Sequence, residues 1–343
     1  MTKIGKYLIL IISPLFESLA YSQLSNKLEN KKWINVNVER KDGSKVVDSE
    51  MDSESQSITY FFKKGKLNAT FSMRAQSNYY DLKDSILTLG KFQKYKLENV
   101  NDTSLVMSEI TMNLPDDKVN RYYFISNDNL ERYAKKHELL KFENDTVIFS
   151  NSIVTPSLDI ADYIKNLNIN SNVEIKGSIL FNPYGIIKEI KYLNSDSSNK
   201  EVVKNLNKII NSTSRKWTMP NISKKYYIRM PFKIGKLTQG GFVVVLWMLH
   251  DINKSFVSNR NIKKSKAEFV LATQLYSQGK FIEAKGHYDF ALTLDSLNTD
   301  AYYNRAATNF KLKMLSESCN DWKQLMNLGQ KEGERLYNAN CIK

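Results

Sequence analysis

Cysteine, histidine, proline and glycine are all scarce in this chain, which has 343 residues but only 2 Cys, 3 His, 6 Pro and 13 Gly. A structural zinc site takes about four Cys or His ligands at short spacings, and these residues are too few and too far apart to supply them. The low proline and glycine content excludes collagen-like and linker-dominated chains. We therefore expect neither a metal site nor a cofactor.

Catalytic motifs are missing as well. The sequence has no Ser–His–Asp order, no phosphate-binding loop, no paired-carboxylate motif and no metal-ligand spacing. Its three histidines lie in separate segments, and we expect His137 and His287 on helices, in solvent or in packing contacts. The chain is therefore predicted not to be an enzyme.

Positive charge, in contrast, is abundant. Lys and Arg number 50 against 36 Asp and Glu, a net charge of +14, and hydrophobic residues make up 42% of the chain. The composition is that of a globular protein, and the length suits about two or three domains. A basic protein of this kind binds nucleic acid or faces other anionic polymers, and composition alone does not choose between the two.

Residues 1–22 have the pattern of a secretory signal. Lys3 and Lys6 precede an apolar run, Tyr7–Phe16, and Ala20–Gln23 offers a cleavage site with small residues. The run is shorter than the roughly 20 apolar residues that a spanning helix needs. We expect export to the periplasm or cell envelope of a diderm bacterium, which argues against nucleic acid as the partner. A buried N-terminal helix and a retained anchor are the alternatives.

Residues 27–125 are predicted to form an antiparallel β barrel or sandwich. Short alternating runs recur about every 8–12 residues, and the tetrapeptide Lys63–Lys66 predicts a hairpin turn between two of them. The predicted strands are Trp33–Val38, Ile58–Phe62, Leu67–Phe71, Ser85–Leu89, Lys94–Leu97, Ser104–Met112 and Arg121–Ile125.

This β region resembles bacterial lipocalin-like domains in three places, namely Trp33, Tyr80–Leu89, and Tyr95–Leu97 leading to Leu105–Met107. The resemblance implies a barrel that carries a small apolar ligand, with Phe61, Phe71 and Tyr80 in its wall. The alternative is that these aromatic side chains fill the core, because barrels of eight strands are just wide enough for side chains to fill.

A helical or irregular connector is expected at 126–155, with a helix over Asn127–Leu140 and a strand at Thr146–Phe149. Residues 156–240 then follow the order helix, hairpin, helix, strand, with these elements at Ala161–Leu167, Val173–Leu193, Glu201–Ile210 and Tyr226–Pro231. That order describes a two-layer α+β domain. The chain is thus predicted to be a multidomain α+β protein.

The 156–240 domain resembles the C-terminal domain of TonB-type proteins at Lys176–Phe181, Gly185, Lys216–Pro220 and Met230–Phe232. Members of that family add a segment of an outer-membrane transporter to a sheet edge, and some relatives contact peptidoglycan. Strand addition uses the unpaired backbone groups of an exposed edge. The resemblance implies that Lys225–Met230 is the edge strand and that Tyr226, Tyr227 and Arg229 contact the peptide.

The same domain concentrates the positive charge, since 159–236 hold 14 basic and 6 acidic residues. Lys200, Lys204 and Lys208 recur at every fourth position and would line one helix face. This basic helix face is either simply solvated or steers the protein toward anionic lipopolysaccharide or an acidic partner. Trp217, which follows the helix, is expected to pack it onto the sheet.

The segment 241–261 contains the apolar run Phe242–Leu249. Eight residues are too few to cross a bilayer as a helix. We expect a buried strand or a packed linker here, with contact to a membrane surface as the alternative.

Residues 262–343 resemble tetratricopeptide repeats. A shift of about 34 residues, the period of that family, aligns Ala272 with Ala306, Ala284 with Ser318, and Tyr288 with Trp322. The resemblance implies an all-α unit capped by a helix over 333–341. Its concave side would dock a protein through Tyr302, Asn304 and Arg305.

Cys319 and Cys341 are the two cysteines of the chain, and both fall in this helical unit. In an exported protein such a pair favours a disulfide, although two buried thiols are the alternative. The disulfide would tie the predicted last helix to the repeat before it.

Together these features predict an exported adaptor without catalytic activity. The TonB-like sheet edge would bind an envelope peptide or protein, or alternatively peptidoglycan, and the repeats would dock a protein partner. Two alternatives remain. One is a carrier of a small apolar ligand in the β domain, and the other is a TonB-type energy transducer that keeps residues 1–22 as its anchor.

N-terminal sequencing of the protein recovered from the periplasm tests the export prediction. We expect the mature chain to begin at Gln23, because cleavage follows the small residues before it. A chain that still begins at Met1 would contradict this prediction and favour the retained anchor.

Overall fold

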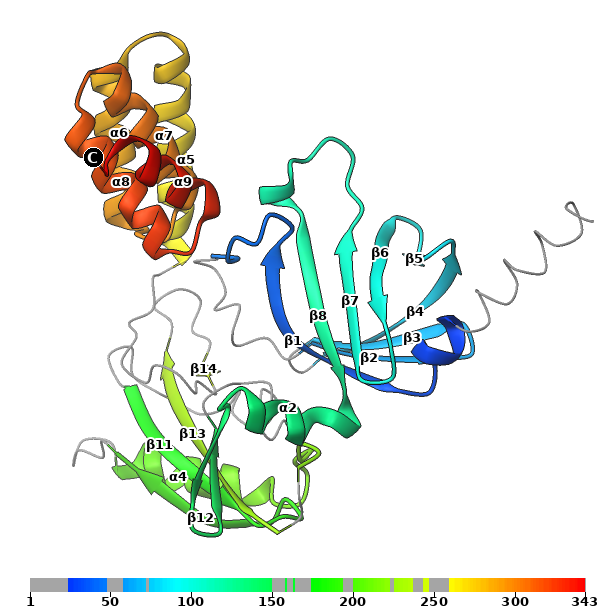
Figure 1. Cartoon of the computed structure of the whole chain (residues 1–343). Coiled ribbons are helices and arrows are strands. Elements are labelled where there is room, and N and C mark those ends of the chain that lie inside the picture. Colours follow the sequence, from blue (N-terminus) through cyan, green and yellow to red (C-terminus); the bar gives the residue numbers. More distant parts are fainter. Residues whose placement is uncertain are drawn as a thin grey trace, which may run out of the picture.

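The computed structural model describes residues 24–47, 58–71, 74–149, 158, 163, 174–193, 200–222, 225–236, 243–246 and 259–342. The predicted signal, the predicted helix Ala161–Leu167 apart from Tyr163, and most of the 241–261 segment lie outside these residues. The described chain forms an N-terminal β barrel, a small mixed sheet with helices, and a C-terminal helical region (Figure 1). The predicted multidomain α+β class is confirmed at this level.

Eight antiparallel strands close into the barrel, in the order β1 to β8 around its circumference. The barrel is closed by pairing of β1 with β8, from Trp33 opposite Ser126 to Arg40 opposite Asn120. The strands are β1 (Lys32–Arg40), β2 (Ile58–Lys63), β3 (Lys66–Phe71), β4 (Arg74–Lys83), β5 (Ile86–Leu89), β6 (Gln93–Val100), β7 (Ser104–Glu109) and β8 (Asn120–Ser126). The predicted hairpin turn lies between β2 and β3, where Lys64 and Gly65 both have positive φ.

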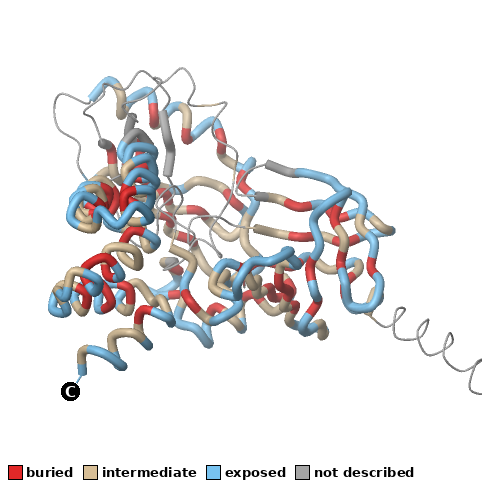
Figure 2. Tube along the Cα trace, turned by 90° about the horizontal axis from the view of Figure 1, so that it is seen from above, coloured by how far each residue is buried: buried red, intermediate tan, exposed pale blue. Residues whose placement is uncertain are grey.

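Side chains fill the interior of the barrel. Along β5 and β6, buried residues alternate with less buried ones (Figure 2), because successive side chains of a strand point to opposite faces. Trp33, Phe62 and Phe124 are at most 1% exposed and belong to one apolar cluster inside the barrel. Tyr60 and Phe62 occupy the inward positions of β2, so Phe61 lies on the other face and is not the interior wall residue that we predicted.

The predicted connector contributes to the second unit. After the 3₁₀ turns η2 (Asp116–Lys118) and η3 (Asn127–Asn129) come α2 (Leu130–Lys136), β9 (Leu140–Glu143) and β10 (Thr146–Phe149). The last two strands join the mixed sheet, whose order is β12-β11-β13-β10-β9, with β14 also paired to β13. The other elements of this unit are β11 (Glu174–Phe181), β12 (Ile187–Tyr192), α4 (Lys200–Ser212), β13 (Tyr227–Lys236) and β14 (Val243–Leu246).

One face of this sheet carries the core of the unit. Ile228, Met230, Phe232 and Ile234 alternate along β13, are all at most 2% exposed, and pack with Leu206 and Ile210 of α4. A Cβ at Gly177 of β11 would lie 2.6 Å from the Phe232 ring, so only glycine fits there. Ile34 and Ile125 of the barrel join the same cluster, which therefore ties the barrel to the mixed sheet.

Five helices form the C-terminal region, namely α5 (Asn259–Ser277), α6 (Phe281–Leu294), α7 (Thr299–Lys311), α8 (Leu315–Asn327) and α9 (Lys331–Asn340). The small residues Ala272, Ala284, Ala306 and Ser318 are fully buried. They are the positions that the 34-residue shift aligned, and their short side chains let neighbouring helices approach closely.

A loop of the barrel holds the helical region in place. Lys45 N donates to Gly329 O at 3.1 Å, and Gln330 Nε2 donates to Lys45 O at 2.9 Å. Lys331 N donates to Ser44 Oγ at 2.9 Å, and Ser44 is itself buried. The turn between α8 and α9 is thereby bonded to the end of β1.

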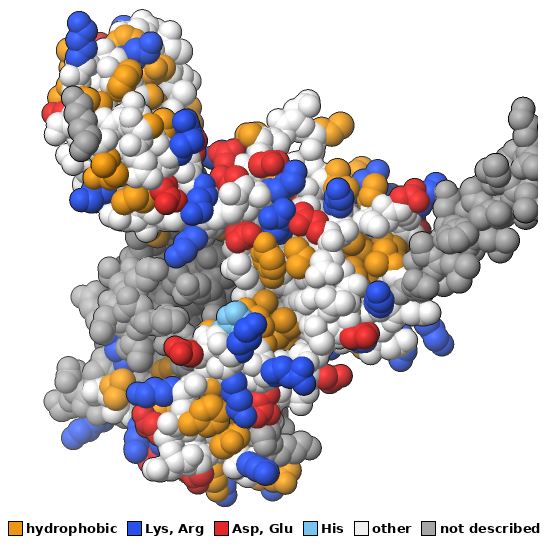
Figure 3. Space-filling model, viewed as in Figure 1, with side chains coloured by type: hydrophobic (Ala, Val, Ile, Leu, Met, Phe, Trp, Pro, Cys, Tyr) orange, Lys and Arg blue, Asp and Glu red, His pale blue; other side chains and the backbone are white. Residues whose placement is uncertain are grey.

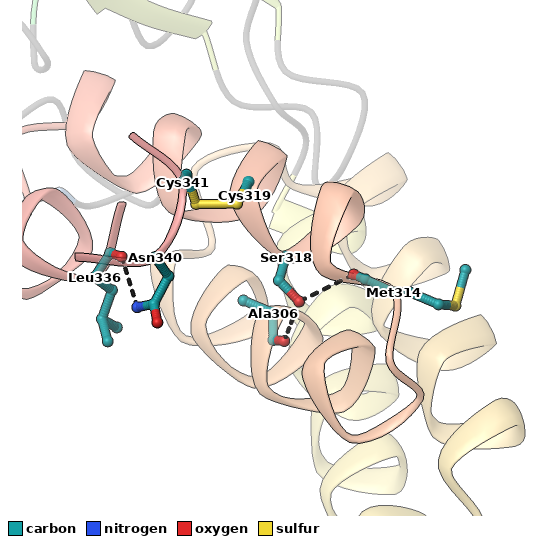
Figure 4. Close-up of a disulfide and its surroundings, with 7 residues drawn as sticks. All are labelled: Ala306, Met314, Ser318, Cys319, Leu336, Asn340 and Cys341. Atoms are coloured by element: carbon teal, nitrogen blue, oxygen red, sulfur yellow. Dashed lines mark hydrogen bonds between the residues drawn. A yellow bond between two sulfur atoms is a disulfide. The ribbon is translucent and has the colours of Figure 1, made fainter. Parts of the chain in front are cut away.

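The predicted disulfide is present. Cys319 of α8 and Cys341, directly after α9, are bonded, with their Cα atoms 5.8 Å apart (Figure 4). The bond holds the last helix against α8 in the cluster that contains Trp322 and Leu325.

Replacing both cysteines by serine should destabilise the helical region by about 3 kcal/mol, since a cross-link over 22 residues restricts the unfolded chain. Urea denaturation with and without reductant measures the effect. Reductant should lower the stability of the wild-type chain to that of the double variant and leave the variant unchanged. Equal stability of the oxidised chain and the variant would contradict the expectation.

Candidate functional site

Strand β12 is one end of the mixed sheet among the described strands. Its register with β11 places Lys191 opposite Ser178 and Ile190 opposite Ile179. Leu193 N donates to Lys176 O at 2.8 Å, and in an antiparallel pair such hydrogen bonds recur at every second residue. Leu193, Lys191 and Glu189 therefore direct their backbone N–H and C=O groups toward β11. The backbone groups of Ile190 and Tyr192 therefore point to the side of β12 on which the described part of the chain places no strand.

The basic helix face lies next to this strand. Tyr192 Oη donates to Asn207 Oδ1 of α4 at 2.9 Å. Asn207 lines a hollow of about 600 Å³ on the flank of α4, together with Lys200, Val203, Lys204, Lys208 and Asn211. The hydrogen bond from Tyr192 thus joins the open strand to the three predicted lysines. We call β12 and these six α4 residues the β12 site.

The β12 site combines hydrogen-bonding groups with cationic side chains. Burial raises the pKa of Tyr192, so its hydroxyl remains a donor at neutral pH. Lys200, Lys204 and Lys208 present ammonium groups beside backbone groups that no described strand pairs with. An extended chain could pair with β12 while its carboxylates reach these lysines. The sequence pattern predicted the three lysines but not Asn207. Asn207 follows Lys204 by three residues and therefore lies on the same face of the helix.

The three predicted peptide-contacting residues lie elsewhere. Tyr227 and Arg229 are on β13, which pairs antiparallel with β11 on one side and parallel with β10 on the other. Tyr227 is opposite Thr146 and Arg229 is opposite Ile148. The prediction that Lys225–Met230 is the edge strand is therefore wrong, because the chain's own β10 occupies that side.

The side chains around β13 are also engaged within the unit. Arg229 Nη2 donates to Glu189 Oε2 at 2.9 Å, and Nη1 donates to Ser178 Oγ at 3.2 Å. The hydrogen bond from Arg229 lowers the pKa of Glu189, which therefore stays ionised at neutral pH. Tyr226 packs edge-on against Phe142 of β9, with ring centroids 5.0 Å apart. These contacts stabilise the sheet.

Trp217 packs as expected. Its ring meets Phe181 of β11 edge-on at 5.1 Å, and its Nε1 donates to Thr213 Oγ1 at 2.9 Å. Only 5% of the residue is exposed. Trp217 therefore holds the end of α4 against the sheet.

In the helical region, Arg305 lies among acidic side chains of its own chain. Its Nη1 donates to Asp289 at 2.8 Å, while Nε and Nη2 donate to the two carboxylate oxygens of Asp321 at 3.1 and 2.5 Å. Burial raises the pKa of Asp321, and the neighbouring Arg305 opposes that shift. The guanidinium also lies over the ring of Tyr302, 5.5 Å from its centroid.

The predicted groove residues therefore differ in their surroundings. Arg305 is bound to α6 and α8, and Tyr302 packs in the apolar clusters of the region. Asn304 is half-buried, and its backbone oxygen accepts from Thr308 Oγ1 within α7. Arg305 is thus a structural residue of the helical region.

A polar cluster inside the barrel was not predicted. Tyr122 Oη donates to Glu109 Oε1 at 2.6 Å, and Asn120 N donates to Glu109 Oε2 at 3.2 Å. Tyr95 meets the Tyr122 ring edge-on, and burial raises the pKa of Tyr95 to about 12. Glu109 therefore has protein donors of its own, and the antiparallel pairing of β6 with β7 and of β7 with β8 brings these side chains together.

In the described part of the chain, no three His, Cys, Asp or Glu side chains are close enough to hold a metal ion. The helices described there include none with the length and apolar character for crossing a bilayer. Comparison with known proteins finds no family model that matches the chain and no curated protein with significant similarity to it.

Arg305→Ala should destabilise the helical region by about 3 kcal/mol, because it leaves the buried carboxylate of Asp321 without its cation. Asn304→Ala, the neighbouring change, should cost less than about 0.5 kcal/mol. Chemical denaturation followed by circular dichroism measures both. Similar stabilities of the two variants would show that the Arg305 network contributes nothing.

Proposed function

We propose that the chain is a non-catalytic adaptor of a bacterial cell envelope that binds an extended, acidic peptide segment at the β12 site. The observation that carries the proposal is the hydrogen bond between Tyr192 and Asn207, which joins an open strand edge to a helix flank with three lysines. The lysines favour a peptide that bears Asp or Glu. Peptidoglycan and lipopolysaccharide, which are also anionic, are the alternative ligands.

Strand addition suits this edge for two reasons. β12 has six residues, enough to form several backbone hydrogen bonds with an added strand. Its partner β11 is held rigidly, because β13 pairs with it over eight positions and Phe232 packs against Gly177. The resemblance to TonB-type C-terminal domains supports the same mode of binding, although we place it on β12 and not at Lys225–Met230.

The helical region is proposed to dock a second protein, in line with its resemblance to tetratricopeptide repeats. Its buried small residues recur at the expected positions, and exposed apolar side chains lie on its surface, among them Val270 and Phe310, each 53% exposed. Because Arg305 is engaged by Asp289 and Asp321, we assign contact with the partner to Tyr302 and Asn304 and not to Arg305.

The alternative functions have less support. An apolar ligand carrier needs space inside the barrel, where the side chains of Trp33, Phe62, Leu67, Leu105 and Phe124 pack together. An energy transducer needs residues 1–22 as an anchor, and these lie outside the described residues. The barrel is better assigned the role of holding the two binding units in place, through Ile34 and Ile125 on one side and Ser44 and Lys45 on the other.

Site-specific photo-crosslinking in an envelope extract tests the β12 site. A crosslinking amino acid in place of Lys188, which is exposed on β12, should capture a partner that the same group in place of Lys323, exposed on α8, does not. Lys204→Glu/Lys208→Glu should lower the captured amount at least about tenfold, since each change reverses a charge near the acidic ligand. Lys63→Glu/Lys64→Glu, on the barrel, is the matched control. Capture that is identical from both positions, or unaffected by the α4 changes, would refute the proposal.

A further inference from the structure

Two loops at one end of the barrel carry exposed apolar side chains. The pairing of Tyr95 with Glu109 places the start of β6 beside the end of β7, so the β5–β6 turn and the β7–β8 loop share this end. Phe92 in the turn is 90% exposed, and Met112 in the loop is 92% exposed. Ile110 and Leu114, also in the loop, are 43% and 51% exposed.

The β7–β8 loop projects from the barrel on an anchored base. It extends beyond the strands at the upper end of the barrel (Figure 1), and hydrophobic side chains are visible at its tip (Figure 3). Ile110 N donates to Lys94 O at 2.8 Å, and Lys41 N donates to Val119 O at 2.8 Å. The two ends of the loop are therefore held, and the apolar side chains between them face solvent.

Positive charge surrounds these side chains. Lys91, Lys94 and Lys96 are exposed at the same end, and no described acidic side chain forms an ion pair with them. In the loop, Asp116 pairs with Lys41 at 3.0 Å, whereas Lys118 pairs at 2.8 Å with Asp300 of α7 and lies 3.9 Å from Asp117.

A hollow next to the loop combines both properties. It has a volume of about 540 Å³, and its lining includes Ile110 and Leu114, the cations Lys41, Lys96 and Arg121, and the carboxylates Glu98, Glu109 and Asp116. Lys41 is paired with Asp116, and Arg121 with Glu98 at 3.0 Å. Among the lining cations, Lys96 forms no ion pair with a described acidic residue, so its ammonium group is available to contact a phosphate group.

We propose that this barrel end binds the surface of a bilayer that contains anionic phospholipid. Phe92, Met112 and Leu114 would enter the boundary between headgroups and acyl chains, and Lys96 would contact a headgroup phosphate. Apolar side chains combined with lysines give this mode of binding, each lysine adding attraction to the anionic surface. A bilayer fits better than a protein because the apolar groups project singly from two loops, and lipid adapts to projecting groups where a protein would need a complementary surface.

Flotation of the purified protein with vesicles tests the proposal. Binding should be strong to phosphatidylcholine vesicles that contain about one third phosphatidylglycerol and weak to phosphatidylcholine alone. Phe92→Ser/Met112→Ser should lower the partition coefficient at least about tenfold, because two apolar side chains no longer insert. Ile282→Ser, a change of a 78% exposed residue on α6, is the matched control and should leave binding unchanged.

A second double variant tests whether the lysines at this barrel end contribute to binding of the anionic vesicles. Lys94→Gln/Lys96→Gln should reduce binding to the anionic vesicles by about tenfold or more. Lys63→Gln/Lys64→Gln, in the β2–β3 turn at the opposite barrel end, removes the same charge and should have a much smaller effect.

A local readout separates this surface from the apolar N-terminal segment. Tryptophan in place of Phe92 should shift its emission to shorter wavelength on anionic vesicles, whereas tryptophan in place of Ile282 should not. The proposal is overturned if neither reporter shifts, if both shift equally, or if Phe92→Ser/Met112→Ser binds like the wild type. It is likewise overturned if Phe92 and Met112 capture an envelope protein while the vesicles remain unbound.

Discussion

Strand β13 is the element on which the rest of the mixed unit depends. Its side chains Ile228, Met230, Phe232 and Ile234 form one buried row, and its two backbone edges pair with β11 and with β10 and β14. α4 packs on this row, and the barrel reaches the same cluster through Ile34 and Ile125. A strand that is paired on both sides has no backbone groups left for an added strand, so the proposed peptide site lies on a strand at the end of the sheet.

That constraint explains the arrangement of the proposed peptide site. The hairpin of β9 and β10 covers the edge of β13 at Tyr227–Arg229, and β12, beside α4, is an end of the sheet among the described strands. The lysines of α4 then flank an available edge, and Tyr192 and Asn207 connect the two. In the proposed site, the ammonium groups would attract an acidic chain and the backbone groups of β12 would pair with it.

The barrel is in contact with both other units, and side chains pack together in its interior. Its inward side chains pack on one another, one outer face contributes to the core of the mixed sheet, and Ser44 and Lys45 bond the turn between α8 and α9. The disulfide between Cys319 and Cys341 then secures the end of that helical region. The proposed peptide site, the proposed lipid-facing loops and the helices are thus carried by one connected framework.

The sequence by itself determined the local features of this protein. The alternation at Trp33–Val38, the turn at Lys63–Lys66 and the stripe of Lys200, Lys204 and Lys208 depend on neighbours close in the chain, and the corresponding strands and helix are present. The small residues that recur after 34 positions are a periodic pattern that the sequence also displays, and they are buried. Only the tertiary structure decided which strands lie side by side. β10 and β13 are about 80 residues apart, and since any strand offers the same backbone donors and acceptors, nothing in their sequences marks them as partners. The position of the open edge, the choice of Phe62 over Phe61 as an inward residue, and the engagement of Arg305 by Asp321 all follow from such long-range packing.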